Sequence, residues 1–167
     1  MKMKSLVMVF VMIVLLAAVG SVSARSVTHF EAHLTGASEV PANGSQAVGQ
    51  AVFRVDGDAI HYRLIVANLD NVRMAHIHYA PAGVNGGVSV WLYPERPPVQ
   101  LIPGTTNGVL MTGTITQADL DALKPAGTDT RPIQTMEQLI AAMVAGNTYA
   151  NVHTDQFPGG EIRGQIK

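Results

Sequence analysis

The chain has 167 residues, a formal net charge of −1 and no cysteine. The lack of thiols excludes disulfides and cysteine ligands, so any metal site must use histidine, carboxylate or methionine side chains. Without Lys2 and Lys4, near the start, the chain is mildly acidic, which gives no electrostatic reason to expect nucleic acid or an anionic membrane as a partner.

Residues 1–24 have the pattern of a secretory signal peptide. A positively charged start precedes an apolar run over residues 6–20, and Val22, Ser23 and Ala24 are the small residues that a signal peptidase reads. The run is shorter than the ~20 residues of a membrane-spanning helix, although a retained N-terminal anchor is the competing interpretation. We therefore expect cleavage before Arg25 and a secreted or periplasmic domain of residues 25–167, with no membrane contact after cleavage.

Alternating apolar residues predict short β-strands in the first part of this domain. Phe30, Ala32 and Leu34 share one strand face. Alternating runs flank an Asp-Gly-Asp turn at residues 56–58, which is typical of a β-hairpin, and a polar turn follows at residues 68–71. The expected strands cover residues 29–34, 51–55, 60–66, 72–79, 88–93 and 109–115.

The C-terminal part adds short helices before two further strands. Thr116 with Asp119 starts a helical turn, and Thr135 with Gln138 forms a capping box for a helix that ends at Gly146. The last strands are expected over residues 148–153 and 161–166. About seven or eight short strands predict an all-β sandwich or Greek-key barrel.

Four stretches occur in a recognisable order. They are Phe-Glu-Ala-His-Leu-Thr-Gly at residues 30–36 with Glu-Val-Pro at 39–41, Ala-His-Ile-His at 75–78, Leu-Ile-Ala-Ala-Met at 139–143 with Gly-Asn-Thr-Tyr at 146–149, and Asn-Val-His-Thr at 151–154 with Phe-Pro-Gly-Gly-Glu-Ile-Arg-Gly-Gln-Ile at 157–166. Together they resemble the CHRD domain, which is named from the developmental regulator chordin and also occurs in many exported bacterial proteins. The resemblance implies an immunoglobulin-like β fold and a partner that is another exported protein. Trp91 and Tyr93 are candidates for an exposed aromatic patch that would contact it.

A His-x-His pair, His76 and His78, followed by His153 near Asp155, is similar in order to copper/zinc superoxide dismutases. That resemblance implies a superoxide-dismutase-like fold and a copper site at these three histidines. The chain departs from those enzymes because it lacks their further histidine ligands and their cysteines, and because Arg163 does not fall where their active-site arginine would. Dismutation is therefore not expected.

The spacing of the pair also has a physical meaning. Alternate residues of a strand share a face, so His76 and His78 can converge on one ion, and His153 would complete a site for copper or, less favourably, zinc. Met74 lies on the same face. Because histidine binds metal in its neutral form, affinity should fall as the pH drops through about 6. In the competing interpretation, the histidines only brace the loops at residues 81–87 and 155–160 by hydrogen bonds.

Other polar residues receive simpler interpretations. His29, Glu31 and His33 form a second same-face set that we expect to be exposed, as is His61, and Glu161 is expected to form an exposed ion pair with Arg163. The sequence leaves three functions open. We favour an exported non-catalytic binding module with a copper site. The alternatives are a mononuclear copper redox enzyme related to superoxide dismutase and a protein–protein interaction domain without metal. The fold class expected is all-β, an immunoglobulin-like or superoxide-dismutase-like Greek-key sandwich or barrel with one or two short helices inserted before the last two strands.

Overall fold

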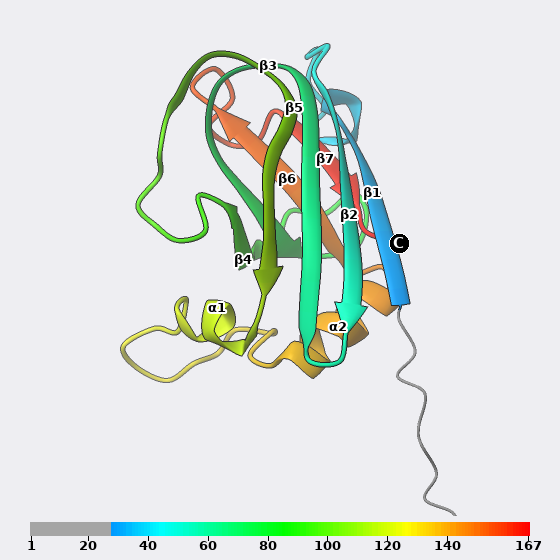
Figure 1. Ribbon diagram of the computed structural model, residues 1–167, viewed down its shortest axis with the longest axis vertical. Coiled ribbons are helices and arrows are strands. Elements are labelled where there is room, and N and C mark those ends of the chain that lie inside the picture. Colours follow the sequence, from blue (N-terminus) through cyan, green and yellow to red (C-terminus); the bar gives the residue numbers. More distant parts are fainter. Residues whose placement is uncertain (1–27) are drawn as a thin grey trace, which may run out of the picture.

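The computed structural model describes residues 28–167, so the predicted signal peptide and its cleavage site before Arg25 lie outside the described residues. The described chain is mostly strand, which confirms the predicted all-β class (Figure 1). The strands are β1 (Thr28–Thr35), β2 (Val48–Asp56), β3 (Ala59–Tyr79), β4 (Gly87–Tyr93), β5 (Ile102–Ile115), β6 (Thr148–Thr154) and β7 (Ile162–Gln165), with a 3-10 turn, η1 (Gly36–Ser38), after β1.

Antiparallel pairing closes the sheet into a flattened barrel. The ring runs from β3 through β2, β1, β7 and β6 back to β3, and β4 and β5 are attached to β3. In Figure 1, β1, β2, β5 and the first part of β3 form the nearer side, and β4, β6, β7 and the second part of β3 form the farther side. The alternating apolar residues of both sides point inward, and Leu64, Ile77 and Ile162 have no exposed surface. The core therefore lies between the two sides, where the alternation predicted it.

β3 is one continuously paired strand, but it reverses its direction in a bend at residues 68–71, where the polar turn was predicted. Its first part is antiparallel to β2 and its second part is antiparallel to β6, and the ring of five antiparallel pairings closes only because β3 turns back. Asn68 and Asn71 have φ values of 60° and 54°, and the pairing register with β5 shifts around them. Asparagine tolerates this left-handed region better than most residues, and the Asn71 side-chain oxygen accepts a hydrogen bond from the Gly104 N–H at 2.9 Å. Before the bend β3 pairs with β2, beyond it with β6 and β4, and β5 pairs with β3 before the bend and as far as Val72 beyond it. The bend thus brings His76 and His78 beside β6.

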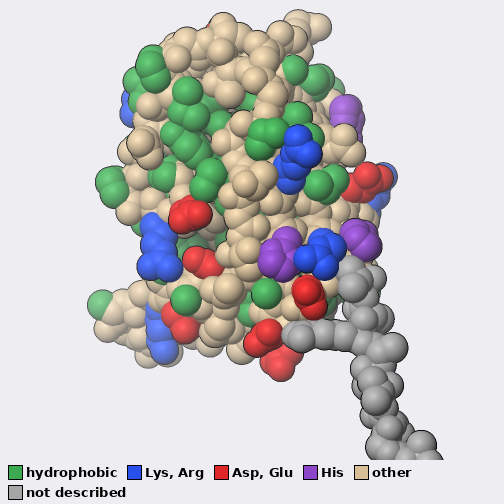
Figure 2. All heavy atoms as spheres, in the orientation of Figure 1, with side chains coloured by type: hydrophobic (Ala, Val, Ile, Leu, Met, Phe, Trp, Pro, Cys, Tyr) green, Lys and Arg blue, Asp and Glu red, His purple; other side chains and the backbone are tan. Residues whose placement is uncertain are grey.

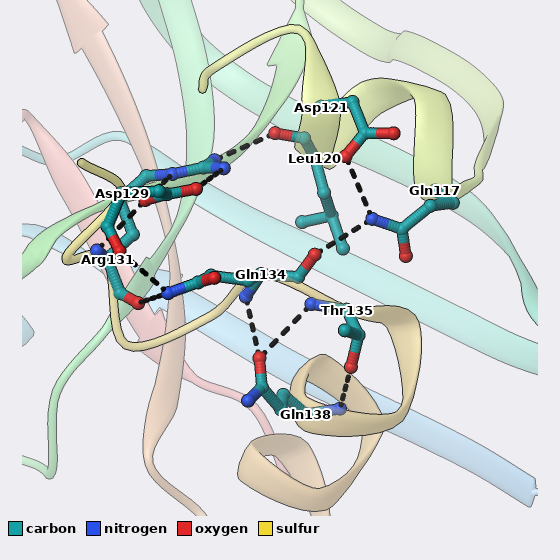
Figure 3. A network of polar contacts seen from close by, with 8 residues as sticks. All are labelled: Gln117, Leu120, Asp121, Asp129, Arg131, Gln134, Thr135 and Gln138. Carbon is teal, nitrogen blue, oxygen red and sulfur yellow. Dashed lines mark hydrogen bonds and ion pairs between the residues drawn. The ribbon is translucent and has the colours of Figure 1, made fainter. Parts of the chain in front are cut away.

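Two short helices, α1 (Gln117–Asp121) and α2 (Met136–Val144), lie between β5 and β6 in the chain and cover one end of the barrel (Figure 1). Both begin with a capping box: the one at Thr135 was predicted, and the one at Thr116 starts the predicted helical turn. Their connection is ordered by a network in which Arg131 bonds to the carboxylate of Asp129 and to the Leu120 carbonyl (Figure 3). Within residues 28–167, no helix is long and apolar enough to cross a membrane.

Candidate metal centre

β3 and β6 place three histidines together on the outer face of the farther side of the barrel. Met74 pairs with His153 and His76 pairs with Asn151, so His153 is a diagonal neighbour of His76. One ligand nitrogen from each of His76, His78 and His153 lies within 4.8 Å of the others. The three side chains that the sequence predicted to converge therefore do lie together, in an arrangement that could hold a metal ion.

All three rings are buried, although they lie on the outer face of the barrel. The exposed fractions of His76, His78 and His153 are 2%, 8% and 6%. The Trp91 ring lies edge-on to His76, with 4.4 Å between ring centroids, and the loops at residues 81–87 and 155–160 contact the other two rings. The histidines visible on the face of β1, β2 and β3 in Figure 2 are therefore not members of this cluster.

Backbone contacts fix the tautomers of two rings. His78 Nδ1 lies 3.0 Å from the Gly86 carbonyl oxygen, and His153 Nδ1 lies 3.0 Å from the Pro158 carbonyl oxygen. A carbonyl only accepts hydrogen bonds, so both Nδ1 atoms carry the hydrogen and both Nε2 atoms keep a lone pair. The loop-bracing bonds of the competing interpretation exist, but they use one nitrogen of each ring and leave the other for a ligand.

The remaining nitrogens are arranged as ligands would be. In the metal-free protein, His76 Nδ1 donates a hydrogen bond to the lone pair of His153 Nε2 at 3.2 Å. An ion that replaced this hydrogen would fit the same spacing, because two nitrogens bound tetrahedrally to one ion at about 2.0–2.1 Å would be about 3.3 Å apart. His76 Nε2 and His78 Nε2 are buried and have no hydrogen-bond partner among the described residues. Buried polar atoms without a partner are uncommon and costly, so the Nε2 lone pair of His78 fits a site for an ion. His76 can offer the same ion only one of its two nitrogens.

Burial holds the cluster in the neutral form that binds metals. Desolvation, with the neighbouring rings of His153 and His78 opposing protonation, lowers the pKa of His76 to about 3. Desolvation lowers the pKa of His78 to about 4 against the opposing effect of the Gly86 hydrogen bond, and it also lowers the pKa of His153. The site of the folded protein is therefore ready to bind well below the pH of about 6 at which ordinary histidines lose their affinity for metal.

The second same-face set is not brought together in this way. His29, Glu31 and His33 are exposed on β1, as expected, and within residues 28–167 they are not grouped closely enough to share an ion. His61 is half-buried rather than exposed, and its Nδ1 lies 3.0 Å from the hydroxyl of Thr114.

Two expectations about surface residues are wrong. Glu161 and Arg163 are only 6% and 2% exposed and do not form an exposed ion pair. Tyr93 is buried, and Trp91 packs against His76, so these two rings do not form an exposed aromatic patch. The loop at residues 81–87 covers Arg163, and a register shift between β3 and β4 places Tyr93 opposite Ala75 in the core. Alternation along a strand indicates neither.

A buried carboxyl group close to the cluster was also missed. Glu39 accepts a hydrogen bond of 2.6 Å from the side-chain amide of Asn151, the residue that pairs with His76. Desolvation raises the pKa of Glu39 to about 7 and outweighs the opposing effects of Asn151 and the charge of Arg163. Glu39 belongs to the Glu-Val-Pro stretch that indicated the family, but nothing in that stretch indicates that its carboxyl group is buried.

A closed antiparallel barrel that carries three buried histidines on its outer face is the class of protein that these observations define. The chain belongs to the CHRD domain family, whose model matches residues 30–166 and so confirms the resemblance seen in the sequence. No curated protein and no solved structure matches the chain.

Proposed function

We propose that this protein is an exported, non-catalytic binding module that holds one copper ion through His76, His78 and His153. The observation that carries the proposal is the set of three buried, neutral imidazoles whose ligand nitrogens lie within 4.8 Å of one another. The buried Nε2 atom of His78, which has no hydrogen-bond partner among the described residues, supports it further.

Copper is the preferred metal on chemical grounds. Imidazole suits both copper and zinc, but the usual affinity order places divalent copper above zinc on nitrogen ligands. His78 and His153 would bind through Nε2, because their Nδ1 atoms are occupied by the Gly86 and Pro158 carbonyl groups. Such carbonyl contacts are typical of metal-binding histidines.

A binding role is favoured over a redox reaction because the cluster is covered. Each of the three rings is at most 8% exposed, and a substrate would have to reach the metal through the loops at residues 81–87 and 155–160. The proposed partner is another exported protein, as the resemblance to chordin implies.

The proposal is tested by purifying the protein from the exported fraction and determining its N-terminus and its bound metal. We expect a chain that begins at Arg25 and carries about one copper per chain, the ratio for a single three-ligand site. Membrane-held protein that begins at Met1 would contradict export. Bound zinc would retain the histidine site but contradict copper, and protein that neither carries nor takes up metal would contradict both.

A further inference from the structure

Arg163 is a buried cation on β7 whose hydrogen bonds go to a loop. Its guanidinium donates to the Val84 carbonyl at 2.8 Å and to the Asn85 side-chain oxygen at 3.1 Å, both in the loop at residues 81–87. Burying a charge is costly unless it is well bonded. β7 therefore holds this loop in place through one side chain.

The same guanidinium is part of a stack that ends on a histidine of the cluster. Arg163 Cζ lies 3.4 Å from the centroid of the Tyr149 ring, and the ring of His78 lies parallel to Tyr149, with 4.8 Å between centroids and 5° between planes. At these distances the guanidinium and the imidazole cannot share one face of the tyrosine. The Tyr149 ring therefore lies between them and restricts the plane of His78.

Gly86 joins the loop to both rings. Its N–H donates to the Tyr149 hydroxyl at 3.1 Å, and its carbonyl accepts from His78 Nδ1 at 3.0 Å. A Cβ atom on Gly86 would lie only 2.0 Å from the Tyr79 carbonyl oxygen, so glycine is required at this place. The next residue, Gly87, has open space at the Cβ position and provides a natural control.

We propose that Arg163 and Tyr149 are positioning residues that act through Gly86 to fix the ring plane and the Nδ1–H tautomer of His78. In that state the Nε2 lone pair of His78 is free to bind together with His76 and His153. The role in metal binding rests on the proposed copper site, whereas the effect on the tautomer does not. A ligand that is oriented before the ion arrives loses less freedom on binding.

The test compares wild type with Arg163→Lys, Gly86→Ala and the control Gly87→Ala. Lysine retains the charge but lacks the planar fork that serves both the loop and the Tyr149 ring. Nitrogen-15 NMR of the metal-free proteins reports which nitrogen of His78 carries the hydrogen, and copper titration reports affinity. We expect a single Nδ1–H tautomer in wild type and Gly87→Ala. Gly86→Ala and Arg163→Lys should show mixed tautomers and bind copper about 10- to 100-fold more weakly.

Wild-type tautomer and wild-type affinity in both Gly86→Ala and Arg163→Lys would overturn the positioning role. If one of the two variants does not fold, the other decides between the two results. In a third outcome, wild-type protein binds no copper but still shows the single Nδ1–H tautomer of His78, and that tautomer is lost in Gly86→Ala. This result would overturn the copper site but support the positioning of His78.

Discussion

His78 and His153 each use one ring nitrogen for the fold and keep the other for a ligand. The His-x-His spacing was sufficient to predict that His76 and His78 share a face, because that geometry is local to one strand. Their burial and tautomers could not be predicted, since these depend on Gly86 and Pro158 in loops whose position is set by distant strands.

At the residue scale, the metal-free protein should lose stability on acidification. Unfolded histidines bind protons near pH 6.5, whereas the folded pKa values of His76 and His78 are about 3 and about 4. The unfolded state therefore binds more protons, and each histidine should lower the free energy of unfolding by about 1.4 kcal/mol per pH unit between about pH 6.5 and its folded pKa. Urea unfolding at pH 7, 6 and 5 with a chelator present measures this loss.

Glu39 has an effect on stability with the opposite pH dependence to that of the histidines, so a Glu39 variant supplies a control for the acid-induced loss. Its folded pKa of about 7 lies above the ordinary value of 4.5, so its stabilising effect is complete below pH 4.5 and is lost as the pH rises through 7. Glu39→Gln should remove this effect and make the loss on acidification steeper. A Glu39→Gln variant whose stability did not change between pH 7 and pH 5 would contradict neutral buried histidines.

At the scale of elements, local signals were interpreted correctly where the structure is local. The hairpin turn at residues 56–58, with Gly57 at φ 67°, the helical turn at Thr116 and the capping box at Thr135 were predicted because a few adjacent residues determine them. The polar turn at residues 68–71 was also predicted, because asparagine is a local signal for a turn, and β3 does reverse its direction in a bend there. The sequence did not predict that one paired strand continues through this turn, because that depends on β5 and β6, which are remote in sequence.

Asn71→Ala should weaken this bend. The change removes the hydrogen bond from the Gly104 N–H and places alanine at a φ of 54°, so we expect the free energy of unfolding to fall by about 1–3 kcal/mol. Asn71→Gly loses the same hydrogen bond without the backbone strain and should cost less. Denaturant unfolding measures both, and equal stability of wild type and Asn71→Ala would contradict the role given to the bend.

At the scale of the whole molecule, alternation and the CHRD resemblance were sufficient to predict the barrel and its core. They were not sufficient to predict which parts of the outer face are covered. β6 is buried along its whole length, on both faces, and so is the Arg163 side chain of β7. Polar residues in an alternating strand usually indicate an exposed face. Here the polar residues of β6 and Arg163 of β7 are buried on the outer face of the barrel.

The barrel should fold without metal, because its core is continuous and made of apolar side chains. We expect a cooperative unfolding transition in the presence of a chelator. Leu64 has no exposed surface, so Leu64→Ala should lower the free energy of unfolding by about 2–5 kcal/mol through lost burial and a residual cavity. Loss of the cooperative transition on adding chelator alone would instead make the metal structural.

The most direct test of the copper site is a calorimetric copper titration of wild type, the His76→Ala/His153→Ala double variant, His78→Ala and the control His61→Ala. Wild type and His61→Ala should each bind one copper with the same affinity, because His61 lies outside the cluster. The other variants, once shown to unfold cooperatively, should bind it severalfold more weakly or not at all, because they lack imidazole ligands. Equal binding by wild type and the double variant would contradict the site.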